Sequence, residues 1–171
     1  MANKILKLTN VKLMMNMRNF SGRGDDWNPE GYRNFFVKID EETAQMLSES
    51  GVKVKTFIPK PDSPYAEEGP THAIKIKLKF HQNDNGTYYP QILVIPESRE
   101  YKTIITPIDA SELDRMDIIE AETMYISCVS WERKGSSGVG LWLRQAAFII
   151  REDPFAARYR EIPIYGRDQN E

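Results

Sequence analysis

Two tryptophans with cations close by in the sequence are the side chains of this chain best suited to binding chemistry. Arg133 and Lys134 follow Trp131, and Arg144 stands two residues after Trp142. Indole rings stack on nucleobases, and guanidinium and ammonium groups pair with phosphates. The set therefore predicts a surface for single-stranded nucleic acid. A tryptophan pair packed in the core of a hairpin is the structural alternative, and the sequence leaves both open.

A long β-hairpin over residues 121–151 is the element expected to hold these side chains. Its arms are rich in apolar and aromatic residues, and its turn near 134–138 contains two glycines, which tolerate positive φ. If the turn closes symmetrically between its two serines, Trp131 lies opposite Trp142, and Val129 lies opposite Arg144. Both indoles and the guanidinium would then share one face.

Lysines at alternate positions form a second cationic group. A strand expected over 72–81 alternates three lysines with apolar residues, and the segment 52–58 carries two more. Side chains in a strand alternate between two faces, so pairing of these strands would gather five ammonium groups on one face. The alternative is that these lysines lie on the solvent-exposed face of a sheet, where lysines protect edge strands from aggregation. The five are Lys53, Lys55, Lys75, Lys77 and Lys79.

The loop over 18–33 interleaves aromatic and basic residues with glycine and proline. Such a loop can wrap a strand of nucleic acid, with Arg23 and Trp27 as contacts. Equally, Phe20 and Tyr32 could anchor the loop while Arg23 pairs with a neighbouring aspartate. The sequence leaves both interpretations open.

Catalytic and metal-binding patterns are weak. His72 and His81 are expected on opposite faces of one strand. The neighbours of the single cysteine, Cys128, predict a buried thiol in a strand. A zinc site is therefore not expected. The glycine-rich segment 135–140 lacks the Walker lysine spacing and opens no helix. We predict no catalytic residue, no metal and no cofactor.

Composition indicates an ordinary globular protein. The 171 residues are 40% hydrophobic and 28% charged, which fits one domain over 1–160 with a flexible C-terminal tail over 161–171. One cysteine, no signal peptide and no apolar run near ~20 residues predict a cytoplasmic protein without a membrane partner. The net charge of −2 argues against a wholly basic surface, but local clustering of cations decides nucleic-acid binding.

Alternation and turn signals predict a mainly β fold. A small OB-fold-like Greek-key β-barrel with long hairpin extensions and one or two short helices fits this layout, and an open sandwich is the alternative. Strands are expected over 4–17, 33–39, 52–58, 72–81, 87–95 and 101–106, and the first of them should have a bulge near Thr9–Asn10. A turn is expected at 83–86. Helices are expected over 41–50, after Asp40, and over 110–115, after Asp109.

The sequence resembles a family of phage and mobile-element OB-fold proteins that bind single-stranded DNA. Short motifs in the same order carry the resemblance over most of residues 10–160. They are 19–22 (NFSG), 31–35 (GYRNF), the helix after Asp40, 52–55 (VKVK), Trp131 through 135–139 (GSSGV) and 153–159 (DPFAARY).

The resemblance implies sequence-tolerant binding of single-stranded DNA in phage or mobile-element replication or recombination, inside a bacterial host cell. It also implies that Arg33, the two lysine rows and the Trp131–Trp142 hairpin lie along the DNA groove. Bacterial single-strand binders carry an acidic C-terminal tip that recruits partners, whereas 167–171 is only mildly acidic. A homo-oligomer and replication or recombination proteins are further candidate partners.

Two other functions stay open. A structural or protein-interaction component of phage assembly would use the hairpin against a partner chain, and a small nuclease would use the scattered carboxylates with a divalent metal. For the leading interpretation, the expected nucleic-acid-binding residues are Arg23, Trp27, Arg33, Lys53, Lys55, Lys75, Lys77, Lys79, Trp131, Arg133, Lys134, Trp142 and Arg144.

Overall fold

The computed structural model describes residues 4–24, 26, 28–96, 106–132 and 138–151. The first strand candidate is divided into β1 (Lys4–Thr9) and β2 (Lys12–Asn19). Asn10, at the break, has φ 56°, a left-handed conformation that asparagine tolerates. The expected irregularity near Thr9–Asn10 is confirmed, and it has a consequence for pairing. β1 pairs with β10, whereas β2 pairs with β3.

The middle of the chain contains a strand, a helix and two further strands. They are β3 (Asn34–Ile39), α1 (Glu41–Glu49), β4 (Val54–Phe57) and β5 (Thr71–Lys77), with a 3₁₀ turn η1 (Ala66–Glu68) between the last two. The predicted N-cap is confirmed, because Asp40 Oδ1 accepts a hydrogen bond of 2.7 Å from the backbone N of Thr43. Hydrogen bonding to the side chain of Thr43, and then to its backbone, lowers the pKa of the exposed Asp40 carboxyl.

The strand expected over 72–81 is wrong at its C-terminal end. β5 ends at Lys77, opposite Asn34, where its partner β3 begins. One bond of 3.1 Å from the backbone N of Leu78 to the carbonyl of Arg33 continues the register, but the backbone N of Arg33 bonds to Gly31 instead of pairing back. The two histidines therefore belong to different strands. A small hairpin of β6 (His81–Gln82) and β7 (Tyr88–Tyr89) follows, closed by the predicted turn, in which Gly86 N donates to Asn83 O.

The predicted return strand over 87–95 is divided at Pro90, which has no N–H to donate. Its second part is β8 (Gln91–Pro96). Beyond it lie β9 (Thr106–Pro107) and α2 (Ala110–Arg115), which starts after Asp109 as predicted. Most of the strand expected over 101–106 lies outside the described residues. The long hairpin is confirmed as β10 (Ala121–Glu132) and β11 (Val139–Ile150).

Among the described residues, nine strands form one sheet with the main order β1-β10-β11-β5-β3-β2. β4 adds to β5, and β8 adds to β11 and carries β9. β11 runs parallel to β5 and β8, and the other ladders are antiparallel. The predicted mainly β class is confirmed. No ladder between described residues joins β1 to β2, which the bend at Asn10 connects covalently, so barrel closure stays a prediction.

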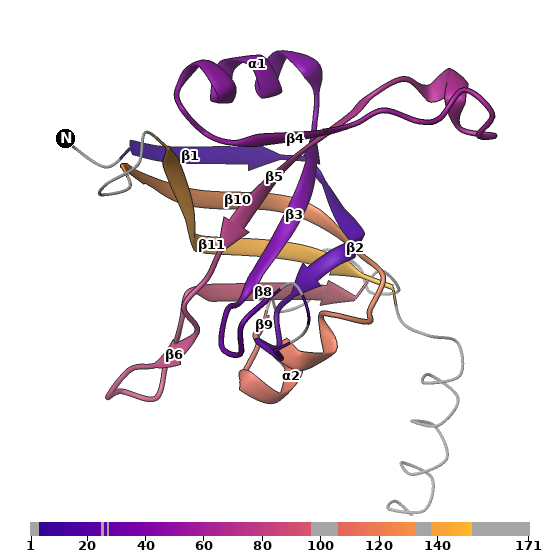
Figure 1. The fold of residues 1–171 in the computed structure, drawn as a ribbon. Coiled ribbons are helices and arrows are strands. Elements are labelled where there is room, and N and C mark those ends of the chain that lie inside the picture. The colour runs from indigo at the N-terminus through magenta and orange to yellow at the C-terminus, as the bar shows by residue number, and fades with distance from the viewer. Residues whose placement is uncertain (1–3, 25, 27, 97–105, 133–137, 152–171) are drawn as a thin grey trace, which may run out of the picture.

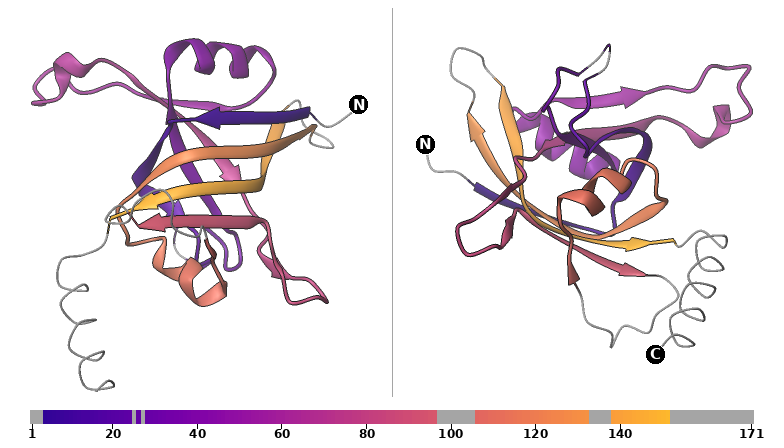
Figure 2. Two further views of the ribbon diagram at one scale, coloured as in Figure 1. Left: turned by 180° about the vertical axis from the view of Figure 1, so that it is seen from behind. Right: turned by 90° about the horizontal axis from the view of Figure 1, so that it is seen from below.

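The strands curve around a shared interior, with α1 and α2 at opposite ends (Figures 1 and 2). The segment between β4 and β5 extends away from the body as an arm. Three fully buried phenylalanines lie in the core. Phe20 stacks on Phe35 at 4.8 Å between centroids, and Phe148 meets both rings edge-on. Phe20 therefore anchors the start of the loop over 18–33, as one of the two interpretations expected.

A polar network fixes the same loop to the chain before β10. The Arg18 guanidinium donates to the carbonyls of Met14, Met116 and Ile119. Burial lowers the pKa of this guanidinium, against the opposing effect of nearby carboxylates, Asp117 first. Asp117 in turn accepts hydrogen bonds from the backbone N atoms at positions 20 and 21. Arg18 is thus occupied in holding the fold.

Candidate nucleic-acid interface

The two tryptophans of the hairpin form a pair, although not in the expected register. Their ring centroids lie 5.0 Å apart with an interplanar angle of 32°. In the ladder Trp131 lies opposite Gly140, and Trp142 lies opposite Val129, so the indoles meet diagonally. The expected direct pairing is wrong because the arms pair Glu132 with Val139, whereas the symmetric turn would have paired Glu132 with Leu141.

Gly140 explains how the diagonal pair forms. A Cβ built at this position would lie 2.5 Å from Cη2 of Trp131, so only glycine leaves room for the indole over the β11 backbone. Trp131 and Trp142 are half-buried, and neither belongs to the buried core cluster. The structure therefore contradicts the alternative interpretation, in which the two tryptophans pack in the core. Both rings keep surface that a ligand can reach.

Arg144 is the extra residue of a β-bulge. Ser127 pairs with Gln145 and Cys128 pairs with Leu143, so Arg144 has no opposite residue, contrary to the expected pairing with Val129. The bulge directs Arg144 and Gln145 to the same outer side, where both line one pocket. Arg144 is exposed there.

The two lysine rows lie together, as expected if their strands pair. β4 and β5 are antiparallel neighbours. Lys53, Lys55, Lys75 and Lys77 line one pocket of about 170 Å³, with Phe36 and Gly140 among its other walls. The Nζ atom of Lys55 lies 5.0 Å from the centroid of the Phe36 ring. The lysines therefore surround a partly aromatic floor.

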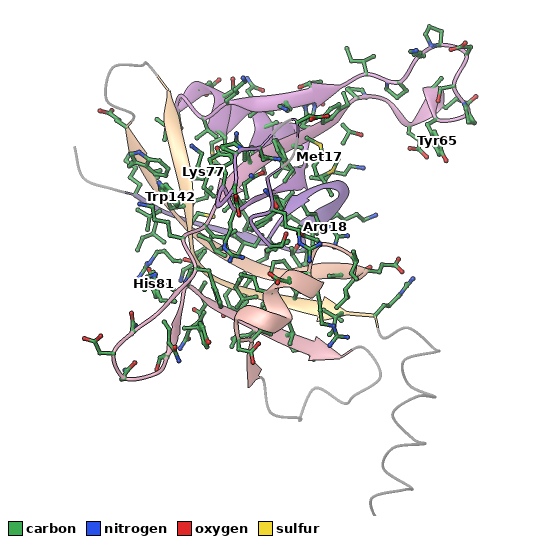
Figure 3. All side chains as sticks on the ribbon, turned by 60° about the horizontal axis from the view of Figure 1, so that its bottom comes forward. Met17, Arg18, Tyr65, Lys77, His81 and Trp142 are labelled. Carbon is green, nitrogen blue, oxygen red and sulfur yellow. The ribbon has the colours of Figure 1, made fainter. Side chains whose placement is uncertain are left out.

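The lysine rows and the tryptophan pair form one surface, because β11 lies beside β5. Trp142 pairs in parallel register with Lys77. The Nζ atoms of Lys77 and Lys79 lie 6.0 and 5.2 Å from an indole ring centroid of Trp142, within the range of cation–π contact. Figure 3 shows Lys77 and Trp142 side by side on one flank, far from Tyr65 on the arm. We call this surface the lysine–tryptophan surface.

Tyr32 belongs to this surface, whereas one of the two interpretations of the loop over 18–33 had it as an anchor of the loop. Its ring centroid lies 5.2 Å from Nζ of Lys75 and 5.3 Å from Nζ of Lys77. Burial raises the pKa of the Tyr32 phenol, but hydrogen bonding and attraction to the two ammonium groups outweigh it, and the net pKa is lowered. The lysine row on β5 thus lies beside an aromatic ring, Tyr32, from the loop over 18–33.

Of the other expected site residues, two belong to the described part of the loop over 18–33 and three lie outside the described residues. Arg33 donates its Nη1 hydrogen to the carbonyl of Phe20, so its guanidinium helps to hold the loop. Arg23 is exposed on that loop, and its carbonyl accepts from Asn19. The last three lie outside the described residues, namely Trp27, Arg133 and Lys134.

Among the described residues, no group of three or more His, Cys, Asp or Glu could hold a metal ion. Cys128 is buried, as expected, and this burial raises the pKa of its thiol to about 12. In the part of the chain that the structure describes, no helix is long and apolar enough to cross a membrane.

Sequence comparison decides the family. A family model described as "Putative phage ssDNA-binding domain" matches residues 2–170. The chain belongs to this family. The match includes the loop over 18–33, both lysine rows and the whole hairpin, so the lysine–tryptophan surface lies inside the family's domain. The predicted resemblance to phage single-stranded DNA-binding proteins is confirmed.

Three solved structures from bacteriophage Enc34 are similar to this member of the family at low identity. Its single-stranded DNA-binding protein in complex with ssDNA has 16% identity and a TM-score of 0.45, covering 87% of this chain and 86% of that chain. A C-terminal truncation has 13% identity and a TM-score of 0.44, covering 87% and 84%. A further structure of the single-stranded DNA-binding protein from this phage has 15% identity and a TM-score of 0.42, covering 87% of this chain and 81% of that chain. Comparison with curated protein sequences finds no significant match.

Proposed function

We propose that this protein binds single-stranded DNA with little sequence preference and without catalysing a reaction on it. One observation carries the proposal. Two lysine ammonium groups lie within 6.0 Å of the Trp142 ring, which is itself paired with Trp131. Membership in a family of phage single-stranded DNA-binding domains supports it.

The arrangement matches both parts of a nucleotide. Every base has a π-face, so stacking on an indole tolerates any sequence and contributes about 1–3 kcal/mol per base. The phosphates that link the bases are anions, and the lysines around the pocket would pair with them. Local cation density, rather than the net charge of −2, sets this attraction. The role would be in phage or mobile-element DNA replication or recombination in the bacterial host cytoplasm.

Intrinsic tryptophan fluorescence during titration with oligo-dT tests the proposal. We expect saturable quenching at low salt that weakens as salt rises, because phosphate pairing releases counterions. Trp131→Ala and Trp142→Ala should each lower the affinity while the circular dichroism spectrum stays that of a folded protein. No quenching and no gel shift at low salt would overturn the proposal and favour a protein-interaction role for the hairpin.

The lysines have a separate test in the salt dependence. Each lost phosphate contact reduces the slope of log K against log salt by about 0.7 for single strands, so replacing Lys75, Lys77 and Lys79 by glutamine should reduce it by about 2. Lys60→Gln is the matched control, because Lys60 is exposed on the arm. An unchanged slope in the triple variant would assign those lysines to a merely solvated face.

A nuclease makes a different prediction. Incubation with single-stranded DNA and a divalent cation should leave the DNA intact. Metal-dependent cleavage that copurifies with the protein would contradict the non-catalytic part of the proposal.

A further inference from the structure

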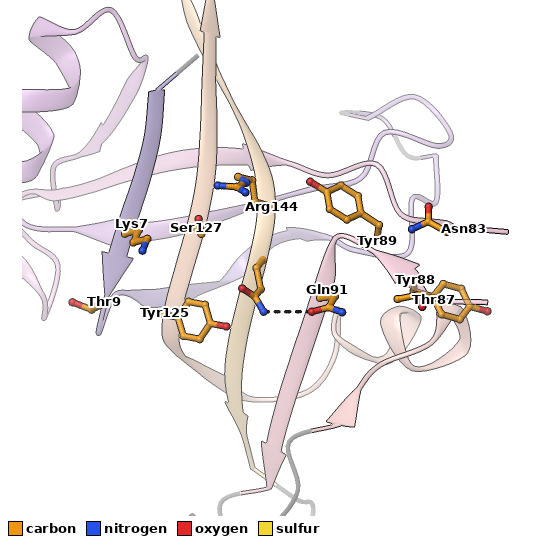
Figure 4. Close-up of a pocket in the computed structure, with 11 residues that line it drawn as sticks. Lys7, Thr9, Asn83, Thr87, Tyr88, Tyr89, Gln91, Tyr125, Ser127 and Arg144 are labelled. Carbon is orange, nitrogen blue, oxygen red and sulfur yellow. Dashed lines mark hydrogen bonds between the residues drawn. The ribbon is translucent and has the colours of Figure 1, made fainter. Parts of the chain in front are cut away.

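A second concave surface lies on the outer side of the sheet, beside the lysine–tryptophan surface. It is a pocket of about 640 Å³ lined by residues from β1, β8, β10, β11 and the β6–β7 hairpin (Figure 4). These strands come from both ends of the chain, and β11 brings them together by pairing with β10 and β8. The lysine–tryptophan surface does not account for this pocket.

The pocket contains aromatic rings, cations and amides together. Tyr125 and Tyr89 are among its walls, and the Tyr89 side chain is 43% exposed. Lys7 and Arg144 line it as well, and no aspartate or glutamate is among the described residues that line it. Gln145 donates to Gln91 at 3.5 Å, a long bond that leaves amide atoms able to bond a ligand. A phenol ring and a cation beside it suit a base and its phosphate.

Alternation along β10 connects this pocket to the tryptophan pair. Trp131, Ser127 and Tyr125 are separated by even numbers of residues, so the three point to the same outer face. At about 3.4 Å per residue, Tyr125 lies roughly 20 Å along the strand from Trp131. The neighbouring strand provides Trp142 and then Arg144 on the same face, and the bulge adds Gln145 to that face. An extended strand of DNA can therefore follow one face from the indoles to the tyrosines.

We infer that this tyrosine pocket is a second nucleotide subsite on the same single-stranded DNA. The inference rests on the proposed function, which assigns the DNA to the lysine–tryptophan surface. Tyr89 or Tyr125 stacks on a base, Lys7 and Arg144 pair with phosphates, and the amides of Gln91 and Gln145 bond a base edge. The strand then runs from the lysine pocket, over the indoles, to the tyrosines.

Oligonucleotide length distinguishes this path from a single site. We compare the shortest oligo-dT that quenches the tryptophans with one twice as long, for wild type, Tyr89→Ala, Tyr125→Ala and Arg144→Gln. We expect the tyrosine variants to bind the longer oligonucleotide roughly 5- to 150-fold more weakly, the range for one stacked base, and the short one unchanged. Tyr65→Ala is the matched control, since Tyr65 is 62% exposed on the arm.

A measurement on wild type guards against variants that fail to fold. Oligo-dT with 5-iodouracil at successive positions should crosslink on irradiation to the indoles from some positions and to Tyr89 or Tyr125 from others. Crosslinks confined to the lysine–tryptophan surface, with long-oligonucleotide affinity unchanged in the variants, would overturn the subsite and leave the proposed function intact. Absence of any binding by wild type would instead overturn the proposed function itself.

Discussion

Replacing Gly140 by alanine should displace the Trp131 indole and weaken DNA binding without unfolding the protein. A Cβ at position 140 would lie 2.5 Å from Cη2 and 2.6 Å from Cζ2 of Trp131. Both atoms belong to one rigid ring, so the whole indole must rotate away from β11. The pairing with Trp142 at 5.0 Å between centroids is then lost.

Two losses of known size follow. An aromatic pair contributes about 0.5–1.5 kcal/mol beyond its buried area, so the free energy of unfolding should fall by about that amount. One stacked base contributes about 1–3 kcal/mol, so the affinity for oligo-dT should fall roughly 5- to 150-fold. The loss of affinity should match that of Trp131→Ala, because both changes remove the same platform.

The assay combines urea unfolding, tryptophan fluorescence titration and the far-ultraviolet circular dichroism signal of coupled indoles. The matched control is Gly140→Ala made in a Trp131→Ala protein, where the added methyl has no indole to displace. There the glycine substitution should have little further effect on affinity. If Gly140→Ala loses the indole coupling but binds DNA like wild type, the tryptophan pair is not part of the interface and the reasoning is refuted.

Asp117→Asn should lower the free energy of unfolding by about 1–3 kcal/mol in urea, because the Asp117 carboxylate accepts two backbone N–H bonds. An equal loss in the exposed Asp114→Asn would contradict this. Cys128, with its thiol pKa raised to about 12 by burial, should react with thiol reagents only after unfolding. Labelling of the folded protein at the rate of a free thiol would disprove its burial. Tyr32 should ionise below the ordinary pH range of a tyrosine phenol in an absorbance titration, and oligo-dT should raise its pKa by adding phosphate near the lysines. Its early ionisation should vanish in Tyr32→Phe; persistence there would assign the low pKa to another tyrosine.

Elements that depend on local chemistry could be predicted from the sequence. Asp40 and Asp109 precede their helices, the turn at 83–86 closes its hairpin, and the break at Asn10 lies where the alternation slips. The end of β5 could not be predicted, because it lies opposite Asn34, the residue at which its partner strand β3 begins. A periodic pattern contains no information about such a partner.

The same limit applies to the candidate site. Period-two spacing predicted the lysine rows, and their shared pocket follows from it. Tyr32 beside Lys75, and Tyr89 with Tyr125 around a second pocket, come from segments far apart in the sequence. A signal was present for Gly140, since a glycine inside a strand often marks a close approach. That signal could have corrected the register of the tryptophan pair.

β11 is the strand that makes one surface out of these parts. It pairs with β10, β5 and β8, so the indoles, the lysine row and the tyrosine pocket all border it. A regular strand would turn Gln145 inward after an outward Arg144, but the bulge keeps both outward and returns Ala146 to the core. Because a shift of one residue exchanges the two faces of a strand, the bulge lets β11 fill the core at Ala146 and Phe148 while still presenting Trp142 and Arg144. Core packing and the proposed DNA path therefore depend on the same extra residue.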